Sequence, residues 1–164
     1  MKKKLGLALG AGGARGVAHV GFLQALDDAG IRADFVTGCS MGSIVGACYC
    51  AGVSMAEVRP VVTGLKLSRI ASLNVNMLRA CGLFRLNKAR KLLEEYIGEE
   101  TTFDELKIPF RCVATDLISG KTVCFSKGNV IDAIIASSSV PGAFSPVEGD
   151  GMLLVDGGVI ERVP

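Results

Sequence analysis

The sequence is poor in aromatic residues and nearly devoid of histidine. Its 164 residues include no tryptophan, two tyrosines and one histidine, His19. No apolar run approaches the roughly 18 residues that a membrane-spanning helix requires. Residues 5–9 are too few for the apolar core of a signal peptide, so a cytoplasmic location is expected. Scattered Lys and Arg, few aromatics and a net charge of +2 argue against nucleic-acid binding.

The cysteine pattern argues against a metal site. Of the six cysteines, Cys48 and Cys50 are separated by one residue, which is not zinc-ribbon spacing, and no histidine lies nearby. With no export signal, the thiols are expected to be reduced, and most should be small core residues. The expectation is therefore that the chain needs no metal and no cofactor.

The composition indicates a globular chain with a substantial core. Hydrophobic residues make up 49% of the chain and charged residues 21%. The mean hydropathy of +0.44 is high for a soluble domain. It indicates strands buried on both faces, or a surface that meets lipid at the membrane periphery. The length suits one domain, which is expected to span residues 1–164.

Strand-like and helix-like patterns alternate along the chain. Short apolar runs predict strands at residues 5–9, 34–37, 110–115, 122–125 and 153–155. Helical periodicity predicts helices at residues 17–29 and 131–136, and a third that follows Gly42 and ends near residue 51. A further helix is predicted to begin at Asn87, which would be its N-cap. Ser54 with Glu57 forms a capping-box pattern for a further helix. This alternation favours α/β layers around a mostly parallel sheet.

The stretch from Leu67 to Leu86 is the least regular part of the sequence. Its apolar residues are interspersed with Asn, Arg and Gly. Irregular apolar connections often serve active sites, so a lid over an apolar substrate is slightly favoured over a segment that covers the core.

The segment Gly38-Cys39-Ser40-Met41-Gly42 fits G-x-S-x-G, the pattern of a nucleophilic serine between a strand and a helix. An apolar strand precedes it and an apolar helical run follows. The glycines Gly38 and Gly42 would relieve crowding at this strained turn. Ser40 could instead act only as an N-cap, and Cys39 is a rival nucleophile. The central position favours Ser40, because it is the one that projects.

A serine nucleophile needs a base. The usual hydrolase order places the catalytic histidine after the serine, whereas the single histidine of this chain, His19, precedes Ser40 on the first predicted helix. A carboxylate is therefore expected to serve as the base. Asp156 is the best candidate, because it ends an apolar strand and is followed by the turn glycines Gly157 and Gly158. Ser40 follows another strand end, so in a parallel sheet the two residues could meet at one rim. A turn aspartate without a catalytic role is the alternative. Asp116 is the rival candidate, although it leads into a turn and more plainly suits a structural role.

A glycine-rich loop follows the first predicted strand. Such a loop presents backbone N–H donors either to a developing oxyanion or to a phosphate. A dinucleotide fingerprint begins in it at Gly10-x-Gly12, but Arg15 occupies its third glycine position, so nucleotide binding is the least favoured function.

These motifs together resemble the bacterial patatin-like phospholipases. The resemblance covers Leu5 to Pro164 and rests on four segments in order. They are Gly12-Gly13-Ala14-Arg15-Gly16 with His19-Val20-Gly21, the Ser40 pentapeptide, Ala136-Ser137-Ser138-Ser139-Val140-Pro141 with Phe144 and Pro146, and Asp156-Gly157-Gly158.

The resemblance implies a three-layer α/β/α sandwich and a serine lipid acyl hydrolase. Ser40 would be the nucleophile and Asp156 the base of a Ser–Asp dyad. The segment Gly12, Gly13, Ala14, Arg15 and Gly16 would form the oxyanion hole, with Arg15 helping to position it. The substrate would be a lipid or other fatty acyl ester, cleaved through an acyl-enzyme without a metal.

The chain departs from the family pattern at three places. Ala11 replaces the first glycine of the loop, Arg162 replaces an asparagine before the final Val-Pro pair, and family domains continue beyond this point. The chain is thus either a natural short form or a truncated one, and a homodimer that covers the open sheet edge is one expectation. The alternative function is a non-catalytic regulator that binds a lipid or phosphate-bearing ligand.

Overall fold

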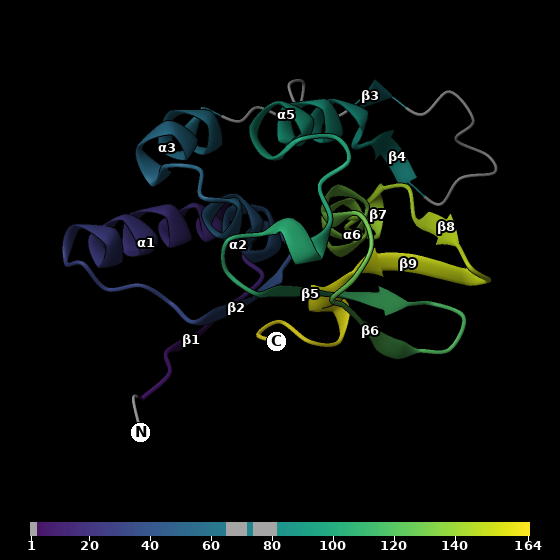
Figure 1. The fold of residues 1–164 in the computed structure, drawn as a ribbon. Helices are drawn as coiled ribbons and strands as arrows, with labels where there is room; N and C mark the ends of the chain where they lie inside the picture. The colour runs from purple at the N-terminus through teal and green to yellow at the C-terminus, as the bar shows by residue number, and fades with distance from the viewer. Residues whose placement is uncertain (1–2, 65–71, 74–81) are drawn as a thin grey trace.

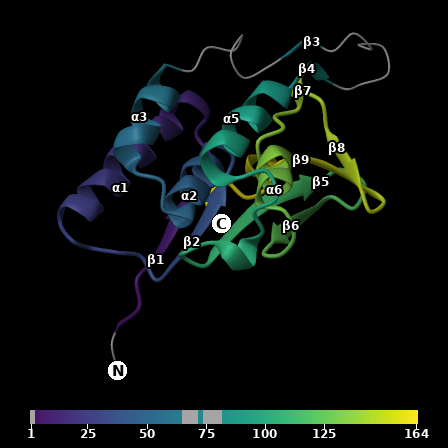
Figure 2. The ribbon, with the colours of Figure 1, turned by 45° about the horizontal axis from the view of Figure 1, so that its top comes forward.

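The computed structural model describes residues 3–64, 72–73 and 82–164, and side chains are described outside 65–85. A six-stranded sheet lies at its centre, with the order β1 (Gly6–Leu9), β2 (Phe35–Cys39), β5 (Phe110–Asp116), β9 (Met152–Asp156) and β8 (Val147–Gly149). Strand β6 (Lys121–Phe125) also pairs with β5. Strands β1, β2 and β5 are parallel and run side by side (Figure 2). The pairs β5–β6, β5–β9 and β8–β9 are antiparallel.

Strand β5 is the centre of the sheet, and its burial matches the high hydropathy of the sequence. It is buried from Cys112 through Asp116. Strand β6 pairs with residues Cys112 to Asp116 along one edge of β5. Strand β2 pairs with residues Phe110 to Val113, and β9 pairs with Ala114 to Asp116. Because a residue has one neighbour on each side, β2 and β9 must share the edge of β5 opposite β6.

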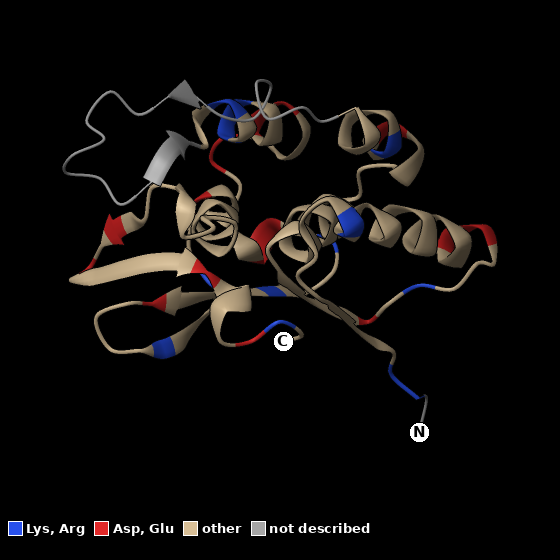
Figure 3. Ribbon diagram, turned by 180° about the vertical axis from the view of Figure 1, so that it is seen from behind, with Lys and Arg blue, Asp and Glu red and all other residues tan. Residues whose placement is uncertain are grey.

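Helices cover one face of this sheet (Figures 1 and 3). Helices α1 (Ala18–Asp28), α2 (Met41–Ala51) and α6 (Val130–Ser137) lie next to the strands. Helices α3 (Met55–Thr63) and α5 (Asn87–Ile97) form a second tier beyond them. This is the α/β class that the alternation of elements predicts. Within the described residues, the sheet forms one layer and the helices on one of its faces form another.

The core lies between the sheet and the inner helices. Its largest fully buried side chains include Leu23 of α1, Val36 of β2, Val45 of α2, and Ile131 and Ile134 of α6. Helix α2 is buried almost all round, which explains why nearly every residue in its sequence is small or apolar.

Several boundaries and short elements differ from the sequence-based expectations. The predicted loop at residues 10–16 contains a 3₁₀ helix, η1 (Gly13–Val17). Leu86 is the N-cap of α5, and Asn87 is its first residue, so the Asn87 cap prediction is wrong. Ser54 does cap α3, accepting a hydrogen bond from the Ala56 N–H.

Among the residues that the structure describes, four short strands were not predicted from the sequence. Strands β3 (Ser72–Leu73), β4 (Gly82–Arg85) and β7 (Gly142–Phe144) form a small second sheet, and β8 forms a hairpin with β9. Two- to four-residue strands give too little alternation to be recognised from sequence. Most of the proposed lid from Leu67 to Leu86 lies outside the described residues.

Candidate active site

Ser40 occupies a sharp turn between β2 and α2. Strand β2 ends at Cys39, α2 begins at Met41, and Ser40 itself has φ of +53° and ψ of −122°. A positive φ is costly for a residue with a side chain and is maintained only where the surrounding structure enforces it. The turn is therefore a strained elbow that places the Ser40 hydroxyl at the N-terminal, electropositive end of α2.

The two elbow glycines permit close packing of the backbone. A Cβ at Gly42 would lie 2.0 Å from the Leu9 carbonyl oxygen, because α2 crosses directly over the end of β1. A Cβ at Gly38 would lie 2.6 Å from the Ser43 Cα. No side chain fits at either position unless the backbone moves. The crowding predicted at the elbow therefore arises from these two backbone contacts.

Asp156 reaches Ser40 from the opposite direction. Cys39, the last residue of β2, pairs with Val113 of β5. Asp156, the last residue of β9, pairs with Ala114, the next residue of β5. Strand β2 is parallel to β5 and strand β9 is antiparallel to it, so the two run toward each other along one edge of β5. They end opposite the adjacent residues Val113 and Ala114. The expectation that both residues end parallel strands at one rim is wrong for β9, although the two residues do meet.

The Ser40 and Asp156 side chains are in contact. The Ser40 Oγ–H donates to Asp156 Oδ2 at 2.5 Å, and both residues are buried. The other carboxylate oxygen, Oδ1, accepts from the Gly158 N–H at 2.7 Å. Burial raises the pKa of Asp156, and the hydrogen bonds from Ser40 and Gly158 only partly oppose this shift. A carboxylate so placed is a stronger proton acceptor than an exposed aspartate.

The end of α6 supports both members of this pair. Ser137 Oγ accepts from the Ser40 backbone N–H at 3.0 Å, and the Ser139 carbonyl accepts from the Asp156 N–H at 2.9 Å. Ser43 Oγ donates to the Ser40 carbonyl at 2.7 Å, which ties the elbow from the other side. The roles of Ser137 and Ser139 were missed by sequence analysis, whose only signal was the serine-rich motif of the family resemblance.

The glycine loop lies beside the elbow and is held by two parts of the chain. His19 Nε2 donates to the Gly10 carbonyl at 2.9 Å, which gives the single histidine a supporting contact to the loop. The Ala11 N–H donates to the Arg162 carbonyl at 2.7 Å, so the two positions that depart from the family pattern contact each other.

Within the loop, Gly13 and Ala14 line the cavity that also contains Ser40. Gly12 accepts at its carbonyl from the Arg15 N–H, and Gly16 is buried against Met41. The Arg15 side chain is exposed and makes no ion pair within the described part of the chain.

The two rival residues have different environments from Ser40 and Asp156. Burial, with the nearby Asp156 and Glu161 carboxylates, raises the pKa of the fully buried Cys39 thiol to about 12, so it remains protonated at neutral pH. The Asp116 carboxylate accepts from the Ser119 hydroxyl, the Leu153 N–H and the Ile118 and Ser119 N–H groups. These bonds lower its pKa to about 2, and they place Asp116 as the organiser of the β5–β6 turn.

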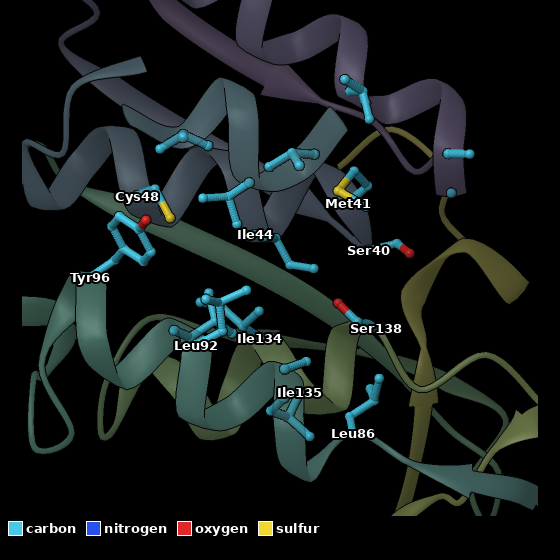
Figure 4. A pocket seen from close by; sticks show the side chains of 18 of the residues that line it. Ser40, Met41, Ile44, Cys48, Leu86, Leu92, Tyr96, Ile134, Ile135 and Ser138 are labelled. Atoms are coloured by element: carbon cyan, nitrogen blue, oxygen red, sulfur yellow. The ribbon is translucent and has the colours of Figure 1, made fainter. Parts of the chain in front are cut away.

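An apolar cavity of about 530 Å³ extends from Ser40 between the two tiers of helices. Figure 4 shows Ser40, Ser138 and Leu86 at one end and Cys48 and Tyr96 at the other, with Ile44 between them. The wall consists mainly of aliphatic side chains from α2, α3, α5 and α6. A cavity of this size and character suits an elongated hydrocarbon group.

Neither a metal cluster nor a membrane span occurs within residues 3–64, 72–73 and 82–164. In these ranges no three His, Cys, Asp or Glu side chains gather in a way that would hold a metal ion. None of the helices there is long and apolar enough to cross a bilayer.

Curated relatives match almost the whole chain. An uncharacterized NTE family protein of Mycobacterium tuberculosis is 38% identical over 161 residues, covering 98% of this chain and 44% of the relative. Lysophospholipase nte1 of Aspergillus fumigatus is 33% identical over 172 residues, covering 98% of this chain and 11% of the relative. The chain therefore spans less than half the length of these relatives.

Solved structures share the fold. VipD from Legionella pneumophila superposes with a TM-score of 0.78 at 15% identity, covering 99% of this chain and 47% of that one. The type III effector protein ExoU superposes with a TM-score of 0.63 at 16% identity, covering 84% of this chain and 39% of that one. The family model described as patatin-like phospholipase matches residues 7–164. The chain therefore belongs to the patatin-like phospholipase family.

Proposed function

We propose that the chain hydrolyses fatty acyl esters of lipids, with Ser40 as nucleophile and Asp156 as general base. The observation that carries the proposal is the 2.5 Å hydrogen bond from Ser40 Oγ to Asp156 Oδ2 at a buried, strained elbow. A nucleophile in contact with a base of raised pKa is the arrangement that activates a serine hydroxyl.

The reaction proceeds in two stages. Asp156 takes the Ser40 hydroxyl proton as Oγ attacks the ester carbonyl carbon. The tetrahedral intermediate collapses, the C–O bond to the alcohol breaks, and Asp156 returns the proton to the leaving alcohol. Water then attacks the acyl-enzyme, giving its proton to Asp156, and Ser40 leaves with that proton as the free fatty acid forms. Backbone N–H groups of the Gly12–Gly16 segment and the N-terminus of α2 would stabilise each oxyanion.

The apolar cavity supports a lipid substrate over a polar one. It begins at Ser40 and is walled by aliphatic side chains, so it would receive the acyl chain while the ester carbonyl stays at the elbow. The Aspergillus relative is named a lysophospholipase, so a lysophospholipid is the first substrate to test.

A fluorophosphonate probe tests the nucleophile, and ester turnover tests the reaction. Labelling should disappear in Ser40→Ala and fall strongly in Asp156→Ala, while Cys39→Ala should still be labelled. Asp116→Asn is the matched control for the carboxylate, because Asp116 contacts the β5–β6 turn and not Ser40. Undiminished labelling of Ser40→Ala would refute the proposal.

Turnover should be measured on lysophospholipids, phospholipids and short-chain esters. Binding of these lipids with no release of fatty acid from any of them would favour the alternative function, a lipid-binding regulator.

A further inference from the structure

Three consecutive serines lie at the C-terminal end of helix α6, and within the described part of the chain only the middle one has a hydroxyl without a hydrogen-bond partner. Ser137 Oγ accepts from the Ser40 N–H, and Ser139 Oγ donates to the Ile135 carbonyl at 2.8 Å. Ser138 is 8% exposed, and its Oγ is fully buried with no hydrogen-bond partner among the residues that the structure describes. A buried hydroxyl without a partner carries a desolvation cost that proteins rarely leave uncompensated.

The position of Ser138 indicates where a partner would come from. Ser138 lines the same cavity as Ser40 and lies at the Ser40 end of it (Figure 4). The neighbouring wall is apolar, formed by Leu86, Ile134 and Ile135. The Oγ itself is covered, so this hydroxyl would pair with a molecule in the cavity after rotation of the Ser138 side chain, and that molecule would carry its polar atoms near Ser40.

We propose that the Ser138 hydroxyl donates a hydrogen bond to an oxygen of the substrate's ester group. This inference rests on the proposed function. The two ester oxygens are the polar atoms that a fatty acyl ester places beside the nucleophile, and both accept hydrogen bonds but donate none. The methylenes of the acyl chain would lie against the mainly aliphatic wall. Ser138 thus recognises the ester and fixes its position at Ser40, whereas Ser137 and Ser139 hold the protein's own groups.

Activity and stability should respond in opposite ways when the hydroxyl is removed. Ser138→Ala should lower kcat/KM for a lysophospholipid by roughly ten-fold or more, because one donor to the reacting group is lost. Its Tm should be unchanged or higher, because an unpartnered buried hydroxyl has been removed. Ser138→Thr, which keeps the hydroxyl, should retain more activity than the alanine variant. A parallel fall in Tm and activity would mean a structural role and would overturn the inference, as would unchanged kcat/KM.

A binding experiment tests the inference without turnover. In the Ser40→Ala background, a long-chain methyl ketone and the alkane of equal length are compared as competitors for a fluorescent fatty-acid probe. The ketone should bind more tightly than the alkane, and adding Ser138→Ala should remove most of that preference. Equal preference with and without Ser138 would overturn the inference. Failure of the proposed function gives a different result, which is absence of turnover and of Ser40 labelling in the wild-type chain.

Discussion

Asp156 and Ser40 meet because two strands that run in opposite directions end at neighbouring residues of β5. Cys39 pairs with Val113, and Asp156 pairs with Ala114. Ser40 follows the first of these pairs directly, so its hydroxyl and the Asp156 carboxylate lie 2.5 Å apart at the point where the strands converge.

Asp156→Asn should abolish most activity without lowering stability at neutral pH. Burial raises the folded-state pKa of Asp156 above its ordinary value near 3.9. The free energy that protonated Asp156 contributes to folding is therefore fully present below pH 3.9. It is lost as the pH rises through the pKa of Asp156 in the folded state. The neutral Asn does not incur that loss, so the Tm of the variant should equal or exceed that of the wild type at pH 7. The difference in Tm should shrink as the pH falls; a lower Tm at pH 7 would contradict this assignment.

The pH dependence of activity should reflect the same group. A base must be ionised to accept the Ser40 proton, so kcat/KM should fall on the acid side with a midpoint above 3.9. The raised pKa of Asp156 sets this direction. A midpoint near 2 would match Asp116 instead, whose pKa is held at about 2. Thermal melts at each pH will separate titration of the site from acid unfolding.

Gly42→Ala should destabilise the fold by about 3 kcal/mol, through overpacking against backbone. The added methyl would lie 2.0 Å from the Leu9 carbonyl oxygen, which cannot move without shifting β1. Gly21→Ala is the matched control, because nothing lies within 4 Å of a Cβ at this exposed helical position. The control should gain about 0.5–1 kcal/mol from helix propensity. Urea unfolding measures both; similar effects in the two variants would rule out the close α2–β1 contact.

Ile44→Trp should shorten the acyl chains that the site accepts. Ile44 lies midway along the cavity between Ser40 and Cys48, so a larger side chain would block its far half (Figure 4). Turnover of palmitoyl esters should fall by roughly ten-fold or more, while butyryl esters should be less affected, because buried methylenes carry the affinity. Ile118→Trp, at an exposed position on the β5–β6 turn, should leave the chain-length profile unchanged.

The Ser40 elbow was predictable because its determinants are local. A strand, two glycines and an apolar helix within residues 35–51 specify the turn, and the positive φ of Ser40 agrees with that pattern. The α/β class followed in the same way from the alternation of apolar periodicities.

The sequence predicted Asp156 as the partner of Ser40, but it did not predict how the two residues are brought together. Its position depends on β9 pairing antiparallel with the second half of β5, a contact between segments about 40 residues apart. No local periodicity specifies which edge of a sheet a late strand joins or in which direction it runs. The hydrogen bonds of Ser137 and Ser139 depend on that same assembly, so they too required the structure.

The convergence of β2 and β9 makes strand length as important as residue identity. Successive side chains of a strand point to opposite faces of the sheet. Leu154 of β9 pairs with Asp116. One residue inserted after Leu154 would move Asp156 away from Ala114 and turn its carboxylate to the other face of the sheet. The chain would then retain every residue of the motif and lose the pair, so an insertion or deletion in this strand would be more damaging than most substitutions.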